Sequence, residues 1–211
     1  MCGRYAVKSD IEEISELFTG KFRYPEFKQN YNVAPSQKAL IVVKDEDGYE
    51  GIMAKWGLLP AWMKADRKPF INARSETVLE KPSFKYLMKG NRCVVPADGF
   101  YEWKKVGGGK QPVYFHLDKP FAFAGFWEKD KESDDKTFLI LTTEANETVK
   151  PVHSRMPVIL EEFQIAAWLE DGDPSVFNSV ASDSLEFHEV STMVNSPANN
   201  SEQCLAPLAP R

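Results

Sequence analysis

Cys2 has the most distinctive chemical position in this chain. Removal of Met1 would leave an α-amine and a thiol on adjacent carbons of one residue. Such a 1,2-aminothiol condenses with an aldehyde through its amine, and its thiol then closes a five-membered thiazolidine ring. The two groups have ordinary pKa values of about 7.7–8.0 and about 8.5, so both are partly nucleophilic near neutral pH. A small residue without a role is the alternative, although Gly3 beside it allows close backbone approach.

Two further segments carry side chains suited to assist such a nucleophile. In the first, Asn72 can donate and accept hydrogen bonds without carrying a charge, and Arg74 offers a planar fork for phosphate. The competing interpretation is that Ser75 and its neighbours only start a helix. In the second, Glu102 lies between Tyr101 and Trp103, and a desolvated carboxyl there would be a general acid or base. An exposed glutamate on a strand edge is the alternative.

The chain has three histidines, and His153 stands out because Arg155 follows it in a loop bounded by prolines. This pair could combine proton transfer with phosphate contact, although a lone histidine is more often structural. His116 and His188 lie in strand-like runs, and we interpret both as structural.

Charge is distributed unevenly along the chain, whose formal net charge is −5. Residues 55–105 contain 11 Lys and Arg against 5 Asp and Glu, whereas 9 acidic residues and one basic residue follow from Glu161 onward. Cations interleaved with aromatic rings suit single-stranded nucleic acid, because the cations meet phosphates and the rings meet unpaired bases. A solvated face with buried aromatics is the bland alternative. The aromatic residues of this stretch are Trp56, Trp62, Phe70, Phe84, Tyr86, Phe100, Tyr101 and Trp103.

Length and composition favour one globular domain over residues 1–211, because 43% of the residues are apolar and 12% are aromatic. No apolar run is long enough to cross a membrane, and the first residues lack the apolar stretch of a secretory signal. Three cysteines without a C-x-x-C pair argue against a disulfide framework and a structural zinc site. We therefore expect a soluble protein of a reducing compartment.

Short strands outnumber helices in the pattern, which predicts a mostly antiparallel, barrel-like α+β domain. A helix is expected over 9–19 with Ser9 and Glu12 as a capping box, and a second over 75–89, interrupted at Pro82 and restarted at Ser83. A third, over 161–169, would place Phe163 and Trp168 inside. Asp45–Gly48 and Gly107–Gly109 are expected to close hairpins. The expected strands cover 39–44, 50–56, 92–96, 112–117, 120–127, 137–143, 156–160 and 185–191.

Taken together, the motifs resemble those of the SRAP family, the SOS-response-associated peptidases or abasic-site processing proteins. The resemblance follows the family's order over essentially the whole chain. It rests on Met-Cys-Gly-Arg-Tyr at the start, Asn72-x-Arg74-x-Glu76, the Pro96-to-Trp103 run, His153-x-Arg155-Met156-Pro157, the run Trp56-Gly57-Leu58-Leu59-Pro60-Ala61-Trp62, and Val194-Asn195.

The resemblance implies a specific activity. SRAP proteins lose the initiator methionine, and Cys2 then traps the aldehyde of an abasic site in single-stranded DNA as a thiazolidine crosslink. By this resemblance Asn72 orients the terminus, Glu102 handles protons during methionine removal and sugar-ring opening, and His153 serves the Schiff-base step. The phosphate contacts would be Arg4, Arg74 and Arg155, and the base-stacking or wedging residues Trp56, Trp62 and Trp103. It also implies an autopeptidase with lyase-type chemistry, no cofactor or metal, a monomer, and a cytoplasmic location, nucleoid-associated if the source is bacterial.

Three other function classes remain open from sequence. Class II glutamine amidotransferases also begin Met-Cys-Gly and use the freed amine as the base for the thiol, although their later glutamine-binding motifs are missing here. A non-catalytic reader of single-stranded DNA or modified bases would use the aromatic and basic region with Cys2 inert. A Cys-His peptidase acting on other proteins is the weakest candidate, because its nucleophile needs no free terminus.

Overall fold

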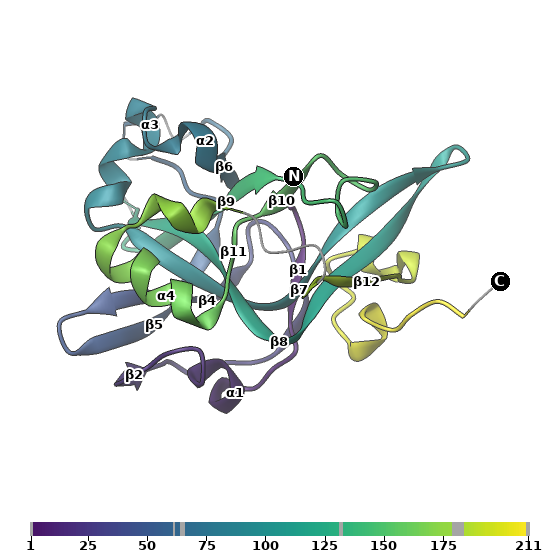
Figure 1. The fold of residues 1–211 in the computed structure, drawn as a ribbon, viewed down its shortest axis with the longest axis horizontal. Helices are drawn as coiled ribbons and strands as arrows, with labels where there is room; N and C mark the ends of the chain where they lie inside the picture. The colour runs from purple at the N-terminus through teal and green to yellow at the C-terminus, as the bar shows by residue number, and fades with distance from the viewer. Residues whose placement is uncertain (1, 61, 64–65, 131–132, 179–183, 210–211) are drawn as a thin grey trace.

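The computed structural model describes residues 2–60, 62–63, 66–130, 133–178 and 184–209. Within these ranges the strands join into one 12-stranded sheet that occupies the centre of the molecule (Figure 1). The strands are β1 (Tyr5–Val7), β2 (Phe22–Arg23), β3 (Asn30–Val33), β4 (Lys38–Asp45), β5 (Gly48–Trp56), β6 (Asn72–Arg74), β7 (Arg92–Val106), β8 (Gly109–Lys129), β9 (Lys136–Glu144), β10 (Arg155–Pro157), β11 (Ile159–Leu160) and β12 (Glu186–Glu189).

Neighbouring strands follow the order β8–β9–β5–β4–β7. Because β7 also pairs with β8, these five strands form a closed ring of pairings. Most pairs are antiparallel, while β2–β5, β5–β9 and β6–β9 are parallel. The predicted α+β class with a mostly antiparallel sheet is therefore confirmed. Residues 93–102 of β7 are all buried, because protein covers both faces of this central strand.

Both predicted hairpin connections are confirmed. Asp45 pairs with Gly48 where β4 turns into β5, and Val106 pairs with Gly109 where β7 turns into β8. The two residues of the second turn, Gly107 and Gly108, both have positive φ angles, of 37° and 90°. Glycine adopts this backbone region without the steric cost that a side chain would bring, which favours the tight turn.

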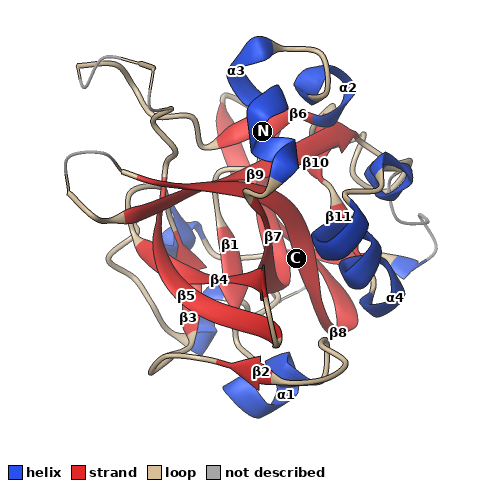
Figure 2. Ribbon diagram, turned by 90° about the vertical axis from the view of Figure 1, so that its left-hand side faces the viewer, coloured by secondary structure: helices blue, strands red, loops and turns tan. Residues whose placement is uncertain are grey.

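Helices are short and lie outside the sheet (Figure 2). The helix predicted over 9–19 is shorter in the structure, where α1 ends at Ser15; Ile14 within it and Leu17 and Phe18 just after it are buried as predicted. Its predicted cap is wrong by one residue, because Asp10 and Glu13 form the capping box. Ser9 instead donates its hydroxyl to Asp98. The elements are α1 (Ile11–Ser15), α2 (Ser75–Val78), α3 (Pro82–Lys85), α4 (Glu162–Ala166), the 3-10 turns Tyr86–Lys89, Pro174–Phe177, Thr192–Asn195 and Glu202–Cys204, and a π-helical turn Ala167–Asp171.

Two other helix predictions need correction at single residues. The interruption near Pro82 is confirmed, but Lys81 is the N-cap and Pro82 takes the first helical turn, so Ser83 is not the cap. Proline fits there because the first turn leaves its backbone nitrogen without a partner in any case. In α4 the prediction for Phe163 is wrong, since it is 74% exposed, whereas Trp168 is fully buried as predicted.

Four short strands, β1, β2, β3 and β6, were not predicted from the sequence. Each has two to four residues, and tertiary pairing defines it more than local periodicity does. Among the described residues, no helix is long and apolar enough to cross a membrane.

Candidate active site

Strand β1 brings the start of the chain alongside the middle of β7. Tyr5 pairs antiparallel with Phe100, and the Tyr101 N–H donates to the Arg4 carbonyl at 2.9 Å. If the same register continued for two residues before Arg4, Gly3 and Cys2 would lie opposite Glu102 and Trp103. The sheet pairing therefore brings together residues that are about one hundred positions apart in sequence.

Cys2 is completely buried in the chain that still carries Met1. Its thiol donates weakly to the Arg4 carbonyl, with an Sγ–O distance of 3.7 Å. Burial raises the pKa of the thiol, and the negative charge of Glu102 raises it further. The sulfur is thus held as a thiol near neutral pH, and it needs a proton acceptor when it reacts.

Asn72 lies at the start of β6, whose parallel pairing with β9 places Asn72 opposite Ile140. Its Nδ2 donates to the Cys2 carbonyl at 2.8 Å. Its Oδ1 is buried and has no hydrogen-bond partner among the described residues. The amide therefore fixes the first peptide of the processed chain and retains one acceptor for a donor brought close to it.

Glu102 is 4% exposed, which contradicts an exposed position at a strand edge. Burial raises the pKa of its carboxyl, while the positive charges of the chain's amino terminus, His153 and Lys110 lower it. A buried carboxyl with a raised pKa retains its proton at higher pH than an ordinary glutamic acid does, which suits a general acid and base. The charge interactions of Glu102 with Cys2 and with His153 show that these residues lie in one neighbourhood.

His153 lies in the turn that leads into β10. Its Nδ1 accepts the backbone N–H of Arg155 at 3.0 Å, and the Arg155 carbonyl oxygen lies 3.2 Å from the same nitrogen. The backbone of Arg155 therefore orients the ring through Nδ1. Cys2, Asn72, Glu102 and His153 thus belong to one site assembled from the N-terminus, β6, β7 and the turn before β10.

The three arginines of the predicted phosphate contacts have different surroundings. Arg74 is exposed at the end of β6. Arg4 donates to the Asn32 side chain at 2.7 Å and to the Val194 carbonyl at 2.6 Å. Arg155 forms a two-pronged ion pair with Glu76. Of the three, Arg74 has the guanidinium most open to a ligand.

The three predicted tryptophan contacts also differ. Trp62 is 57% exposed, whereas Trp56 has no exposed surface and donates its Nε1–H to the Ile71 carbonyl. Trp103 is partly buried, donates its indole N–H to Asn195 Oδ1 at 2.7 Å, and lies under the Arg4 guanidinium at 5.9 Å. Because a base can stack only on an accessible ring face, the structure corrects the assignment of Trp56, which is a core residue.

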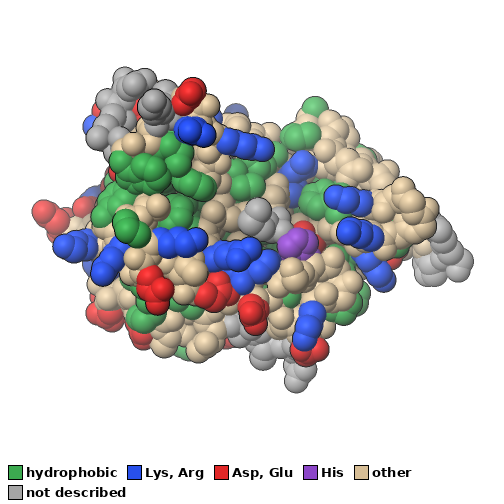
Figure 3. Space-filling model, turned by 90° about the horizontal axis from the view of Figure 1, so that it is seen from above, with side chains coloured by type: hydrophobic (Ala, Val, Ile, Leu, Met, Phe, Trp, Pro, Cys, Tyr) green, Lys and Arg blue, Asp and Glu red, His purple; other side chains and the backbone are tan. Residues whose placement is uncertain are grey.

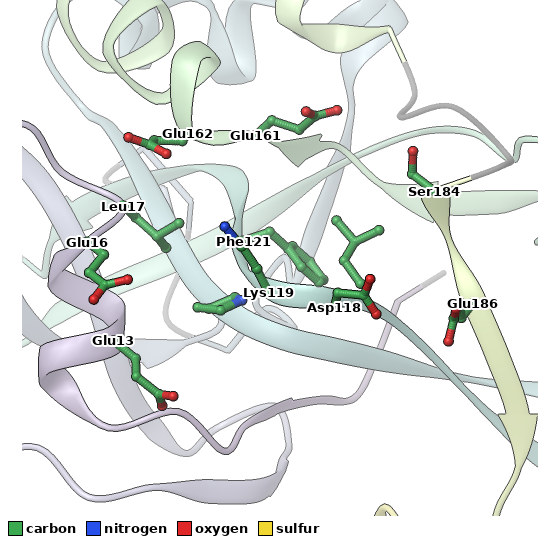
Figure 4. Close-up of a pocket in the computed structure, with 12 residues that line it drawn as sticks. Glu13, Glu16, Leu17, Asp118, Lys119, Phe121, Glu161, Glu162, Ser184 and Glu186 are labelled. Carbon is green, nitrogen blue, oxygen red and sulfur yellow. The ribbon is translucent and has the colours of Figure 1, made fainter.

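Positive charge surrounds the site. Seen from above, Lys and Arg side chains gather on both sides of a histidine at the centre of this face (Figure 3). A separate cavity of about 720 Å³ lies between α1, β8 and the start of α4, with Glu13, Glu16, Glu161 and Glu162 among its lining side chains (Figure 4). Its carboxylates would repel a polyanion, so the charge pattern favours the face that carries the site. Among the described residues, no cluster of His, Cys, Asp or Glu is arranged to ligate a metal ion.

Two residues of the site environment were given no role from the sequence. Asn32 is fully buried and donates to the carbonyls of Val194, Ser196 and Asn199, so it fastens the C-terminal segment beside Arg4. Its partners lie more than 160 positions away, and no local signal could identify them. Glu76 was visible within the Asn72-to-Glu76 motif, but its partner Arg155 was not.

Comparisons with known proteins identify the family of the chain. The family described as SOS response associated peptidase (SRAP) matches residues 1–197. The abasic site processing protein YoqW of Bacillus subtilis is 38% identical, over 97% of this chain and 99% of its own. The abasic site processing protein HMCES of Gallus gallus is 32% identical, over 99% of this chain and 78% of its own.

Solved structures with the same fold come from bacteria. A Bacteroides thetaiotaomicron protein has a TM-score of 0.75 at 26% identity, covering 85% of this chain and 86% of its own. A phage-related protein from Bordetella bronchiseptica has a TM-score of 0.76 at 26% identity, covering 90% and 94%. With the family match over most of the sequence, and with close relatives along nearly its whole length, this chain belongs to the SRAP family.

Proposed function

We propose that this protein processes abasic sites in single-stranded DNA by forming a covalent thiazolidine through Cys2, after its own Met1 has been removed. The observation that carries the proposal is the convergence of three groups on the first residues of the chain. The Asn72 amide holds the Cys2 carbonyl, and the buried Glu102 carboxyl and His153 lie beside them. The relatives named as abasic site processing proteins support the choice of lesion.

The first step is hydrolysis of the peptide bond between Met1 and Cys2. Glu102 takes a proton from the attacking group and returns it to the Cys2 nitrogen as this nitrogen leaves. Water supplies the oxygen of the new Met1 carboxyl and the proton of the new Cys2 amine. The freed amine then has an acceptor in Asn72 Oδ1. The product is a terminal residue that carries both nucleophiles.

The second step exposes the aldehyde. An abasic deoxyribose is mostly a closed hemiacetal, so its ring opens when the ring oxygen gains a proton and the C1′ hydroxyl loses one. A carboxyl whose pKa burial raises can do both in turn. We assign this proton transfer to Glu102.

The third step joins protein and sugar. The Cys2 amine adds to the aldehyde carbon and expels water, with His153 moving the protons, which gives an imine. The thiol then adds across the C=N bond, and its proton goes to the nitrogen. An imine left open acidifies the neighbouring C–H and invites β-elimination, so ring closure protects the strand from cleavage.

DNA binding is assigned to the basic face. Arg74 is the foremost phosphate contact, with Arg4 and Arg155 at the rim of the site, and Trp62 and Trp103 are the candidates for stacking on bases. We propose a monomer that needs no cofactor for this reaction and works in the compartment that holds the DNA.

Intact mass spectrometry tests the proposal directly. We expect the purified protein to lack Met1, and incubation with an oligonucleotide carrying one abasic site to add the mass of that oligonucleotide minus one water. A tetrahydrofuran analogue of the site, which has no aldehyde, serves as the control and should add nothing. A protein that retains Met1 and still forms the adduct would refute the role of the terminal amine.

A further inference from the structure

Glu76 and Arg155 form a tightly held ion pair next to the site. Two N–H groups of the guanidinium meet the two carboxylate oxygens, with Nη2–Oε2 at 2.9 Å, and the Arg155 side chain is only 13% exposed. Nη2 also donates to the carbonyl and the hydroxyl of Thr142 on β9. This two-pronged geometry fixes the plane of the guanidinium as well as its position.

The backbone of the same arginine orients His153. The Arg155 N–H donates to Nδ1 when the ring is neutral, and the Arg155 carbonyl, 3.2 Å from Nδ1, accepts from it when the ring is protonated. One peptide segment therefore holds the ring in both charge states. A residue that fixes Arg155 thus also fixes the direction in which His153 presents Nε2.

Glu76 is linked by sequence to the other half of the site. It lies four residues after Asn72, in the first turn of α2, and Asn72 holds the Cys2 carbonyl. Segment 72–76 thus contacts Cys2 through Asn72 at one end, and the turn that carries His153 and Arg155 through Glu76 at the other. A hydrogen bond from Arg155 lowers the pKa of the Glu76 carboxyl, which keeps the pair ionised at neutral pH.

We propose that Glu76 is a positioning residue that acts through Arg155 to hold His153 for proton transfer at the Cys2 site. The inference rests on the proposed function, because it assigns His153 to that reaction. Glu76 also compensates most of the Arg155 charge, so its removal leaves a largely buried cation that turns toward solvent or phosphate. Loss of Glu76 should therefore slow the chemistry without weakening DNA binding.

The Glu76→Gln variant tests this, with Glu80→Gln as the matched control, because Glu80 is an exposed glutamate just beyond the same helix. We expect Glu76→Gln to slow adduct formation about tenfold at saturating abasic oligonucleotide, which is less than the roughly 10²–10⁴-fold contribution of a general acid or base, because the histidine is displaced and not removed. Affinity for the tetrahydrofuran oligonucleotide should stay the same or rise, and its salt dependence should become steeper. The control should change neither quantity.

Two further measurements keep the proposal open to refutation if the variant is less stable. In an Arg155→Gln background, adding Glu76→Gln should have no further effect on the rate, since Glu76 acts only through Arg155. The ¹⁵N signals of the His153 ring, identified by their loss in His153→Asn, should shift in Glu76→Gln and not in Glu80→Gln. Equal losses of affinity and rate, or additive rate effects, would overturn the proposal.

Failure of the proposed function gives a different result. If the wild-type protein forms no adduct with the abasic oligonucleotide, the covalent chemistry is refuted. The His153 ring signals and the affinity for the tetrahydrofuran oligonucleotide still report on whether Glu76 positions this turn.

Discussion

The two ends of β1 each lie against a buried acid of β7, and the two acids have different surroundings. Beyond the end of β1, Asp98 accepts the backbone N–H groups of Lys8 and Ser9, at 2.7 and 2.9 Å, and the Ser9 hydroxyl at 2.7 Å. Before its start, Glu102 lies near the chain terminus with a pKa that burial raises. The two acids are four positions apart on one strand.

The difference shows how one strand can hold a structural and a chemical carboxyl. Asp98 lies where the β7–β8 register shifts, between Ala97 and Gly99, and three local donors stabilise its charge. Glu102 lies in the regular part of the same pairing, opposite Val113, where the ladder uses its backbone and burial disfavours its charge. Asp98 therefore anchors β1, whereas the raised pKa of Glu102 supports the proton transfer that we propose for it.

The largest effect is expected from replacing Cys2, which precedes β1 at the end that lies near Glu102. Cys2→Ser should lose the durable adduct, because the oxygen ring that serine would close is less stable than a thiazolidine. A denaturing gel after incubation with abasic single-stranded DNA measures this. Cys204→Ser removes another buried cysteine, one that does not carry the terminal amine, and should leave the yield unchanged. Equal adduct yield from Cys2→Ser and wild type would refute the role of the sulfur.

Glu102→Gln separates chemistry from folding. We expect the rate of adduct formation to fall by about 10²–10³, the usual contribution of a general acid or base, with little change in affinity for the tetrahydrofuran oligonucleotide. Rates of Met1 loss and adduct formation, followed by mass, measure the chemical effect. A loss of affinity as large as the loss of rate would make Glu102 structural.

The same variant should be more stable than the wild type at neutral pH. Folding raises the Glu102 pKa, so the wild-type carboxylate costs free energy of folding above that pKa, and this cost disappears as pH falls toward the ordinary value of 4.5. We expect Glu102→Gln to raise Tm by about 2–4 °C at pH 7, corresponding to about 1 kcal/mol in a chain of this size. The difference should vanish near pH 4. A lower Tm for the variant at pH 7 would contradict this sign.

Asp98→Asn should have the opposite pattern. Replacing a carboxylate that accepts three hydrogen bonds should lower the free energy of unfolding by about 2–3 kcal/mol, because charge-assisted bonds are lost and the amide nitrogen faces N–H donors. Urea denaturation measures this. The rate of adduct formation per folded molecule should fall far less than in Glu102→Gln. Should Asp98→Asn lose the rate and keep the stability, the two acids have been assigned in reverse.

Arg74→Gln should have the smallest effect of these variants. It extends the comparison of the two ends of β1 to an exposed arginine at the rim of the site. Loss of one exposed phosphate contact should weaken binding of single-stranded DNA and reduce the slope of log affinity against log salt by about 0.7. Fluorescence anisotropy at several salt concentrations measures both. Lys21→Gln, an exposed cation beside Asp47 at the hairpin of β4 and β5, is the control and should leave the slope unchanged.

Several elements could be predicted from sequence because their signals are local. The hairpin turns follow from glycines and acidic residues between β-branched runs, and the break before α3 follows from Pro82. The apolar stripe of α1 follows from helical spacing. The prediction for Phe163 was wrong because five residues separate it from Trp168 in position, which is about 140° around an α-helix, so the two side chains face different sides.

The chemical types of the site residues were determined by the sequence alone. A cysteine at position 2, a neutral amide, a carboxyl between aromatic residues and a histidine before an arginine are visible without any fold. Only tertiary structure decided which of these groups meet and in what electrostatic state. The pairing of β1 with β7 brings residue 2 near residue 102, burial sets the Glu102 pKa, and packing makes Trp56 a core residue while Trp62 stays exposed. The physical reason is that residue type fixes which reactions are possible, whereas desolvation and long-range contacts, which no local pattern encodes, fix which of them are favoured.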